Sequence, residues 1–184
     1  MRLLRDIADV LTFMVLILGL LFALLFFGVR FVGITPYGVT SNSMAPMYPE
    51  GSVIYVGETV PEEIQKGEVL TFYMTEGGIA SHQVCENDVE NQFFRTQGIN
   101  NHDEKGNILQ DAEPVPYDKV IGKVLFGIPY LGWAHEELTT PPGLYYAIGS
   151  IALVIILNCA VSILEAVTNR KHEKQEEKER ERKR

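Results

Sequence analysis

Two long apolar runs without a charged residue constrain the fold of this chain more than any other feature of its sequence. The first covers Val10–Val29 and contains one polar residue, Thr12, and the second covers Leu144–Leu164. As helices that rise about 1.5 Å per residue, both are long enough to cross a hydrocarbon core of roughly 30 Å. The first run exceeds the ~7–15 residues of a signal-peptide core, and no small-x-small cleavage motif follows it. The sequence therefore predicts transmembrane helices at 10–29 and 144–164. Asn158, inside the second run, is either an interhelical hydrogen-bonding group or a tolerated amide.

The distribution of Lys and Arg around these runs predicts the orientation of the chain. Arg2 and Arg5 precede the first run, and the last fifteen residues carry eight Lys or Arg against five Glu. The twenty residues before the second run contain no Lys or Arg, and Arg30 alone favours the opposite orientation. We therefore expect a multi-pass plasma-membrane protein with both termini in the cytoplasm. Its parts are a cytoplasmic N-terminus at 1–9, an extracytoplasmic domain at 30–143 and a charged cytoplasmic tail at 165–184.

The segment 30–143 is acidic, with sixteen acidic and six basic residues, which argues against a nucleic-acid partner. Stretches rich in β-branched and aromatic residues alternate there with Gly, Asn and Asp turns, and no helical periodicity competes. The predicted strands are Ser52–Val56, Glu68–Tyr73, Ile79–Val84, Gln92–Thr96 and Val120–Phe126. The predicted fold class is a mainly antiparallel β domain outside the membrane with a transmembrane helix at each end.

Cys85 and Cys159 form no disulfide or zinc pattern, and we expect no metal and no cofactor.

Two hydroxyls, those of Ser41 and Ser43, lie two residues apart just beyond the first apolar run, and an extended backbone would place them on the same side. Most such pairs are turn or solvated strand residues. A serine nucleophile needs a base and donors aimed at the developing oxyanion. His82 lies in a predicted strand on the same face as Ala80 and Val84, and imidazole suits general-base work near neutral pH. A semi-buried structural histidine is the alternative interpretation.

Three short motifs in this chain resemble the conserved motifs of one protein family. Ser41-Asn42-Ser43-Met44-Ala45-Pro46, followed by a Gly-Ser-Val-Ile-Tyr-Val strand, resembles the nucleophile box of type I signal peptidases. Ser81-His82-Gln83-Val84 resembles the box that holds the general base, and Thr96–Asn101 resembles a Thr-Lys-Gly-Asp-x-Asn box. Most bacterial members have lysine as the base. Histidine there is similar to the archaeal and endoplasmic-reticulum branch, which some spore-forming bacteria also carry. The resemblance runs from about Val10 to Leu164.

The resemblance implies a role for each matching residue. Ser43 would be the nucleophile, His82 the general base and Ser41 a contributor to the oxyanion hole. Where the family pattern has Asp after Gly, this chain has Ile99. A second family aspartate, which precedes a Pro-Val segment, best matches Asp111, with Asp103 as the alternative. The missing acid at position 99 leaves the orientation of His82 open.

The resemblance implies a membrane-bound serine endopeptidase, a signal peptidase I of Ser-His type, that cleaves N-terminal signal peptides from exported proteins. Its partners would be preproteins with signal peptides and the lipid bilayer, and the secretion translocon is a candidate partner. Two alternatives stay open. One is a catalytically impaired homologue that acts as a membrane-anchored binding module, and the other is a signal peptidase dedicated to a few surface, spore or matrix proteins.

Overall fold

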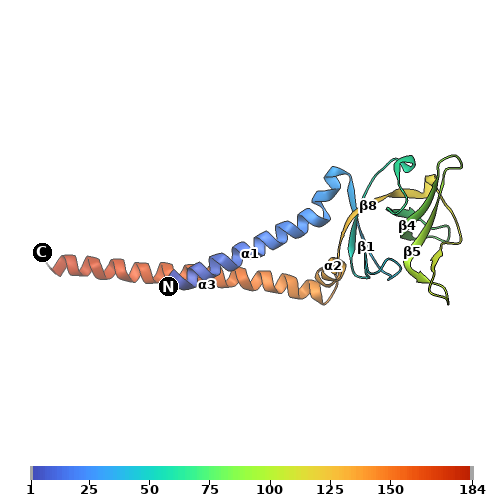
Figure 1. Cartoon of the computed structure of the whole chain (residues 1–184). Helices are drawn as coiled ribbons and strands as arrows, with labels where there is room; N and C mark the ends of the chain where they lie inside the picture. The colour runs from blue at the N-terminus through green and yellow to red at the C-terminus, as the bar shows by residue number, and fades with distance from the viewer. Residues whose placement is uncertain (1, 183–184) are drawn as a thin grey trace. The chain divides into compact units, whose positions relative to one another are not determined.

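A computed structural model describes residues 2–182 of the chain. The chain divides into two compact units. One contains the residues up to Phe22 together with Glu137 and the residues that follow it, and the other runs from Ala23 to Glu136. The first unit is helical and the second is built on a β-sheet (Figure 1).

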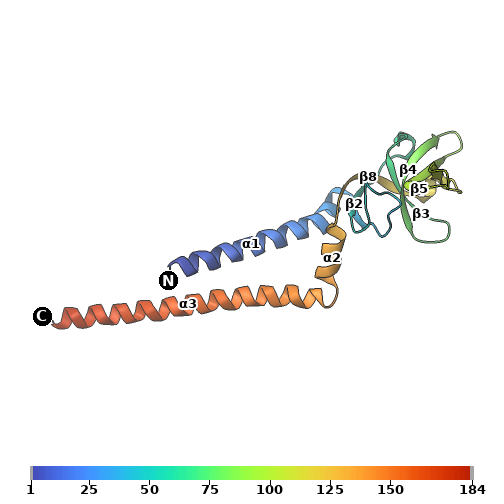
Figure 2. The same cartoon turned by 60° about the horizontal axis from the view of Figure 1, so that its bottom comes forward.

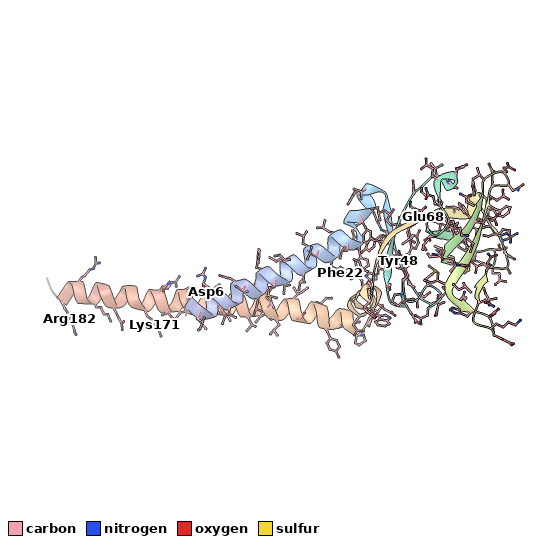
Figure 3. The ribbon with its side chains drawn as sticks, viewed as in Figure 1. Asp6, Phe22, Tyr48, Glu68, Lys171 and Arg182 are labelled. Atoms are coloured by element: carbon pink, nitrogen blue, oxygen red, sulfur yellow. The ribbon has the colours of Figure 1, made fainter. Side chains whose placement is uncertain are left out.

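Two long helices, α1 (Arg2–Phe26) and α3 (Gly143–Arg182), supply the helical unit. Both contain a stretch that is long and apolar enough to cross a membrane, Arg5–Phe26 in α1 and Ile148–Lys171 in α3. The side chains of these stretches project outward along both helices (Figure 3) and are almost entirely exposed. Such exposed apolar surface is stable in lipid but not in water.

Polar contacts join the two helices. The amide of Asn158 donates a hydrogen bond of 2.6 Å to the Thr12 hydroxyl, so the Asn158 side chain acts as an interhelical group. Arg5 on α1 also forms an ion pair with Glu165 on α3. Hydrogen bonds of this kind contribute about 0.5–2 kcal/mol between membrane helices.

The β unit contains eight strands, all paired antiparallel. They are β1 (Ile34–Gly38), β2 (Val53–Gly57), β3 (Val69–Tyr73), β4 (Ile79–Asp88), β5 (Phe93–His102), β6 (Ile108–Gln110), β7 (Val115–Pro116) and β8 (Val120–Ile128). Their order in the sheet is β1-β2-β8-β3-β4-β5-β6, and β7 pairs with β5. Figure 2 labels the strands β2, β8, β3, β4 and β5 of this sheet. Short 3-10 helices occupy Gly28–Val32, Pro61–Glu63 and Tyr117–Lys119, and the helix α2 (Leu131–Thr139) follows β8.

Two apolar clusters form the core of the β unit. The first gathers Leu70, Phe72, Val84, Phe94 and neighbouring residues. The second gathers Met44, Ile54, Val56, Val69 and Val124. Leu70 and Phe94 are completely buried, and burying a large apolar side chain contributes about 1.5–3 kcal/mol. The second cluster includes the residue directly after Ser43, so core packing also fixes the segment that carries the serines.

The mainly antiparallel β fold class with an apolar helix at each end is confirmed, and each of the five predicted strands overlaps an observed strand. Three strands, β1, β6 and β7, were not predicted. The expectation that no helix competes in 30–143 is wrong for Leu131–Thr139, which is helical. The charged residues after the second apolar run continue α3 without a break to Arg182.

Candidate catalytic site

The loop between β1 and β2 carries both serines. Val39 and Gly51 close its base, because Val39 N–H donates to Ser52 O at 2.9 Å and Gly51 N–H donates to Val39 O at 2.8 Å. Gly51 has a φ of +80°, and a Cβ there would lie 2.2 Å from Trp133 Cε2, so both conformation and space require glycine. The loop is thus a closed structure that begins and ends at the sheet.

Three contacts hold the Ser43 segment inside this loop. Met44 is 2% exposed and anchors the chain in the second core cluster. Asn100 on β5 clamps the backbone, since its N–H donates to Ser43 O at 2.8 Å and its side-chain amide donates to Asn42 O at 2.9 Å. A Cβ at Gly98 would lie 3.0 Å from the same Ser43 oxygen, so a small residue lets β5 approach. These contacts fix the position of Ser43 before any substrate binds.

His82 lies on β4, where alternation directs its side chain to the same face as Val84 and the first core cluster. Its ring meets Phe72 edge to face, with centroids 6.2 Å apart, and its side chain is 15% exposed. His82 Nε2 lies 3.2 Å from Ser43 Oγ, and Nδ1 lies 2.6 Å from Asp111 Oδ2. Residues from three separate segments therefore form one continuous chain of hydrogen bonds.

The partners of His82 determine which ring nitrogen carries the proton. An ionised carboxylate can only accept, so His82 Nδ1–H donates to Asp111 and Nε2 is left to accept from the Ser43 hydroxyl. Burial raises the pKa of Asp111, but hydrogen bonds from His82 and Thr96 and the imidazole charge outweigh burial and hold that pKa below its usual value. Thr96 Oγ1 donates to the same carboxylate oxygen at 2.7 Å. Asp111 therefore stays ionised and keeps the imidazole in the tautomer that can receive a proton from serine.

The two candidate acids lie in different places. Asp111 follows β6 and reaches His82, with its amide donating to Thr96 O at 2.8 Å. Asp103 follows β5, and its carboxylate accepts bonds from the backbone N–H of Lys105 and from Asn107 in its own turn. Ile99 packs against the second core cluster and so takes an apolar position. Of the acids named from the sequence, Asp111 is the one beside His82.

Ser41 lies next to the nucleophile candidate. Its Oγ is 3.3 Å from Ser43 Oγ. Both serines and His82 line a cleft of about 410 Å³, together with the apolar side chains of Val39, Met44, Ile54 and Ile79. The two hydroxyls therefore line the same cleft, which is compatible with Ser43 as a nucleophile and Ser41 as a donor to an oxyanion.

Thr96 is the site residue that sequence reasoning missed as a functional group. Its position opposite Val84 in the β4–β5 register puts it on the His82 face, and its side chain is completely buried. A buried hydroxyl needs a partner, and a partly buried carboxylate nearby is the natural one.

Among residues 2–182, no group of three or more His, Cys, Asp or Glu side chains is arranged to hold a metal ion.

A serine bonded to a histidine that is bonded to a carboxylate is the arrangement used for nucleophilic serine catalysis on several unrelated folds. No family model matches the chain. Over 91 residues the chain is 33% identical to signal peptidase I W of Bacillus subtilis (strain 168), a match that covers 48% of this chain and 45% of that protein. The chain thus matches less than half the length of this relative, and the similarity supports a type I signal peptidase family.

Proposed function

We propose that this chain is a membrane-bound serine endopeptidase that removes N-terminal signal peptides from exported proteins. The observation that carries the proposal is the hydrogen-bonded chain Ser43–His82–Asp111, at 3.2 Å and 2.6 Å, at the edge of a cleft. The resemblance of its segments to signal peptidase boxes and the similarity to a Bacillus signal peptidase supply the substrate class.

The mechanism follows from the proton positions. His82 Nε2 takes the proton of Ser43 as Oγ attacks the scissile carbonyl, and Asp111 stabilises the imidazolium that forms. In this mechanism the Ser41 hydroxyl, 3.3 Å from Ser43 Oγ, donates to the developing oxyanion. His82 then gives its proton to the leaving amine, which departs as the new N-terminus of the mature protein. Water, activated by the same imidazole, hydrolyses the acyl-enzyme and regenerates Ser43.

The position of His82 supports our proposal that the enzyme is of the Ser-His type, similar to the archaeal and endoplasmic-reticulum branch. A lysine base would have to reach Ser43, yet His82 already occupies that position at hydrogen-bonding distance. Lys123 binds Glu68 and Lys119 binds Thr75, so these two lysines are engaged elsewhere in the β unit. The imidazole therefore supplies the base function in this proposal.

The membrane placement belongs to the same proposal. The domain 30–143 lies outside the plasma membrane between spans at 10–29 and 144–164, and residues 1–9 and 165–184 lie in the cytoplasm. Signal peptides emerge with their cleavage sites at the outer face, and Ser43 follows the first span by fourteen residues. Preproteins and the lipid bilayer are the direct partners, with the translocon as a further candidate.

Cleavage of a preprotein by the full-length protein in detergent tests this function. The expected result is one cut between signal peptide and mature protein, after a small residue with another small residue two positions before it. Sequencing of the new N-terminus locates the cut. If the protein cuts no preprotein but still binds one, the catalytic proposal fails and a membrane-anchored binding module is the better account. If it cuts only a few surface, spore or matrix preproteins, a dedicated peptidase is the correct reading.

A further inference from the structure

A second cavity, of about 320 Å³, lies on the other side of His82 from Ser43. His82, Ala80 and Met74 line both this cavity and the cleft that holds the serines, so they form a shared wall. Ser41 and Ser43 line the cleft, whereas Asp111 lines the second cavity. The proposed mechanism involves the His82–Asp111 pair, but none of its steps involves this cavity.

The direction of the reaction decides which part of a substrate can reach the second cavity. In serine catalysis the imidazole that deprotonates the nucleophile afterwards protonates the leaving nitrogen. The residues after the scissile bond must therefore cross the His82 side of the acyl carbon. In this structure, a chain that leaves Ser43 across His82 meets the second cavity next. The residues before the cut stay in the cleft with Ser41 and Ser43.

The lining of the second cavity indicates what it accepts. Phe72, Tyr73, Val115 and the prolines Pro114 and Pro116 contribute apolar surface. Three carboxylates, those of Glu76, Asp111 and Glu113, also line it. Lys119, the one lysine of the lining, donates a hydrogen bond of 2.8 Å to Thr75 and leaves the lining with an excess of negative charge. An apolar wall with carboxylates nearby suits a bulky uncharged side chain and disfavours an acidic one.

We propose that the second cavity, formed by the β3–β4 turn and the segment 111–116, is a subsite for the first two residues of the mature protein. It selects a bulky apolar side chain there and rejects an acidic side chain. This inference rests on the proposed peptidase function. It adds a specificity determinant after the cut, where most of the wall consists of residues outside the hydrogen-bonded chain, and His82 and Asp111 form the side nearest Ser43.

The test uses one signal-peptide substrate, constant up to the cut, with Phe, Gly or Asp at the first or the second position after it. The full-length protein in detergent is expected to favour Phe over Gly by about tenfold in kcat/KM at one of these positions, and to cut the Asp peptide more slowly than Gly. Ala112→Leu narrows the cavity and is expected to reduce the Phe preference several-fold. Ala134→Leu, on the exposed surface of α2, is the matched control and keeps the wild-type ratio.

Tyr73→Ala is a second cavity variant, which removes apolar surface from the lining where Ala112→Leu adds bulk. The Tyr73 side chain is 54% exposed, so its removal leaves the core intact. It is expected to lower the Phe-to-Gly ratio as well. Equal rates for the wild type on all three residues, or an unchanged ratio in both cavity variants, would overturn the subsite. A substrate that ends in a small chromogenic amide directly after the cut separates this failure from failure of the peptidase function. If the wild type cleaves that amide, the peptidase function stands whatever the ratios show.

Discussion

At the scale of single residues, the site depends on where one carboxylate lies. Asp111 accepts hydrogen bonds from both His82 and Thr96, and these bonds keep the pKa of Asp111 low despite its burial. The carboxylate of Asp103, eight positions earlier, accepts hydrogen bonds from Asn107 within its own turn. The two aspartates lie in similar polar loop sequences, but of these two it is Asp111 that contacts the imidazole.

Asparagine at each position separates their roles. Asp111→Asn removes the charge that stabilises the imidazolium and offers an amide that can reverse the tautomer of His82, so kcat is expected to fall by about 10²–10⁴-fold. Asp103→Asn leaves His82 and Ser43 in place, so its kcat is expected to stay within about twofold of wild type. Preprotein cleavage rates measure both. A larger loss for Asp103→Asn than for Asp111→Asn would mean that the other acid serves His82.

Sequence reasoning found the nucleophile and base candidates because both lie in short local patterns. The family resemblance favoured Asp111 over Asp103, but which acid pairs with His82 stayed open, because that pairing depends on the hairpin made by β5 and β6. The chain turns at Asp103–Asn107 and returns along β6, which brings Asp111 opposite Thr96. A distance of this kind is a property of strand register and has no signal in residue spacing.

At the scale of elements, an ion pair ties the start of β3 to β8. Lys123 Nζ donates to Glu68 Oε1 at 2.8 Å, and the backbone N–H of Gln65 donates to the other carboxylate oxygen. The hydrogen bonds from Lys123 and Gln65 lower the pKa of Glu68 in the folded protein. Both side chains are about 30% exposed, so the pair stabilises the fold by a modest amount.

The lowered pKa of Glu68 fixes the sign of a pH effect. Since the pKa is lower in the folded state than in the unfolded state, the stabilisation is present above the unfolded value of about 4.3 and is lost as pH falls through the folded value. Glu68→Gln is expected to reduce the free energy of unfolding by about 0.5 kcal/mol at pH 7 and by less at pH 3. Melting of the detergent-solubilised protein at the two pH values measures this. Glu90→Gln, at an exposed position, is the control, and an equal loss at both pH values would contradict the ion-pair account.

The strands that sequence reasoning missed were missed for two physical reasons. β1 contains Pro36, which interior strands avoid because it lacks an N–H, yet β1 lies at the edge of the sheet, where proline is tolerated. β6 and β7 are three and two residues long, too short to show alternation. The strands that were predicted carry runs of β-branched and aromatic residues, and these runs made them predictable.

At the scale of the whole molecule, the central proposal is a chain that crosses the membrane twice. The two helices carry the apolar stretches, and the charged end of α3 supplies the basic residues that favour the cytoplasm. If the proposed orientation is right, a reagent outside the cell reaches the segment between the two spans and does not reach the charged end of α3.

Single cysteines test this topology. With Cys85 and Cys159 replaced by serine, Lys105→Cys lies in the turn between β5 and β6, and Lys178→Cys lies near the end of α3. A membrane-impermeant thiol reagent is expected to label the first in intact cells and the second only after permeabilisation. Labelling of both in intact cells, or of Lys178→Cys alone, would contradict the proposed orientation.

The most direct test of the account is the rate of preprotein cleavage by Ser43→Ala. We expect a loss of at least about 10³-fold against wild type. Within residues 2–182, the Ser43 hydroxyl is the one found at hydrogen-bonding distance from His82 Nε2, so no second hydroxyl is in position to replace it. Ser162→Ala, on the exposed side of α3, is the matched control and is expected to cleave at the wild-type rate. If Ser43→Ala is folded and cleaves within tenfold of wild type, Ser43 is not the nucleophile and the serine peptidase proposal is wrong.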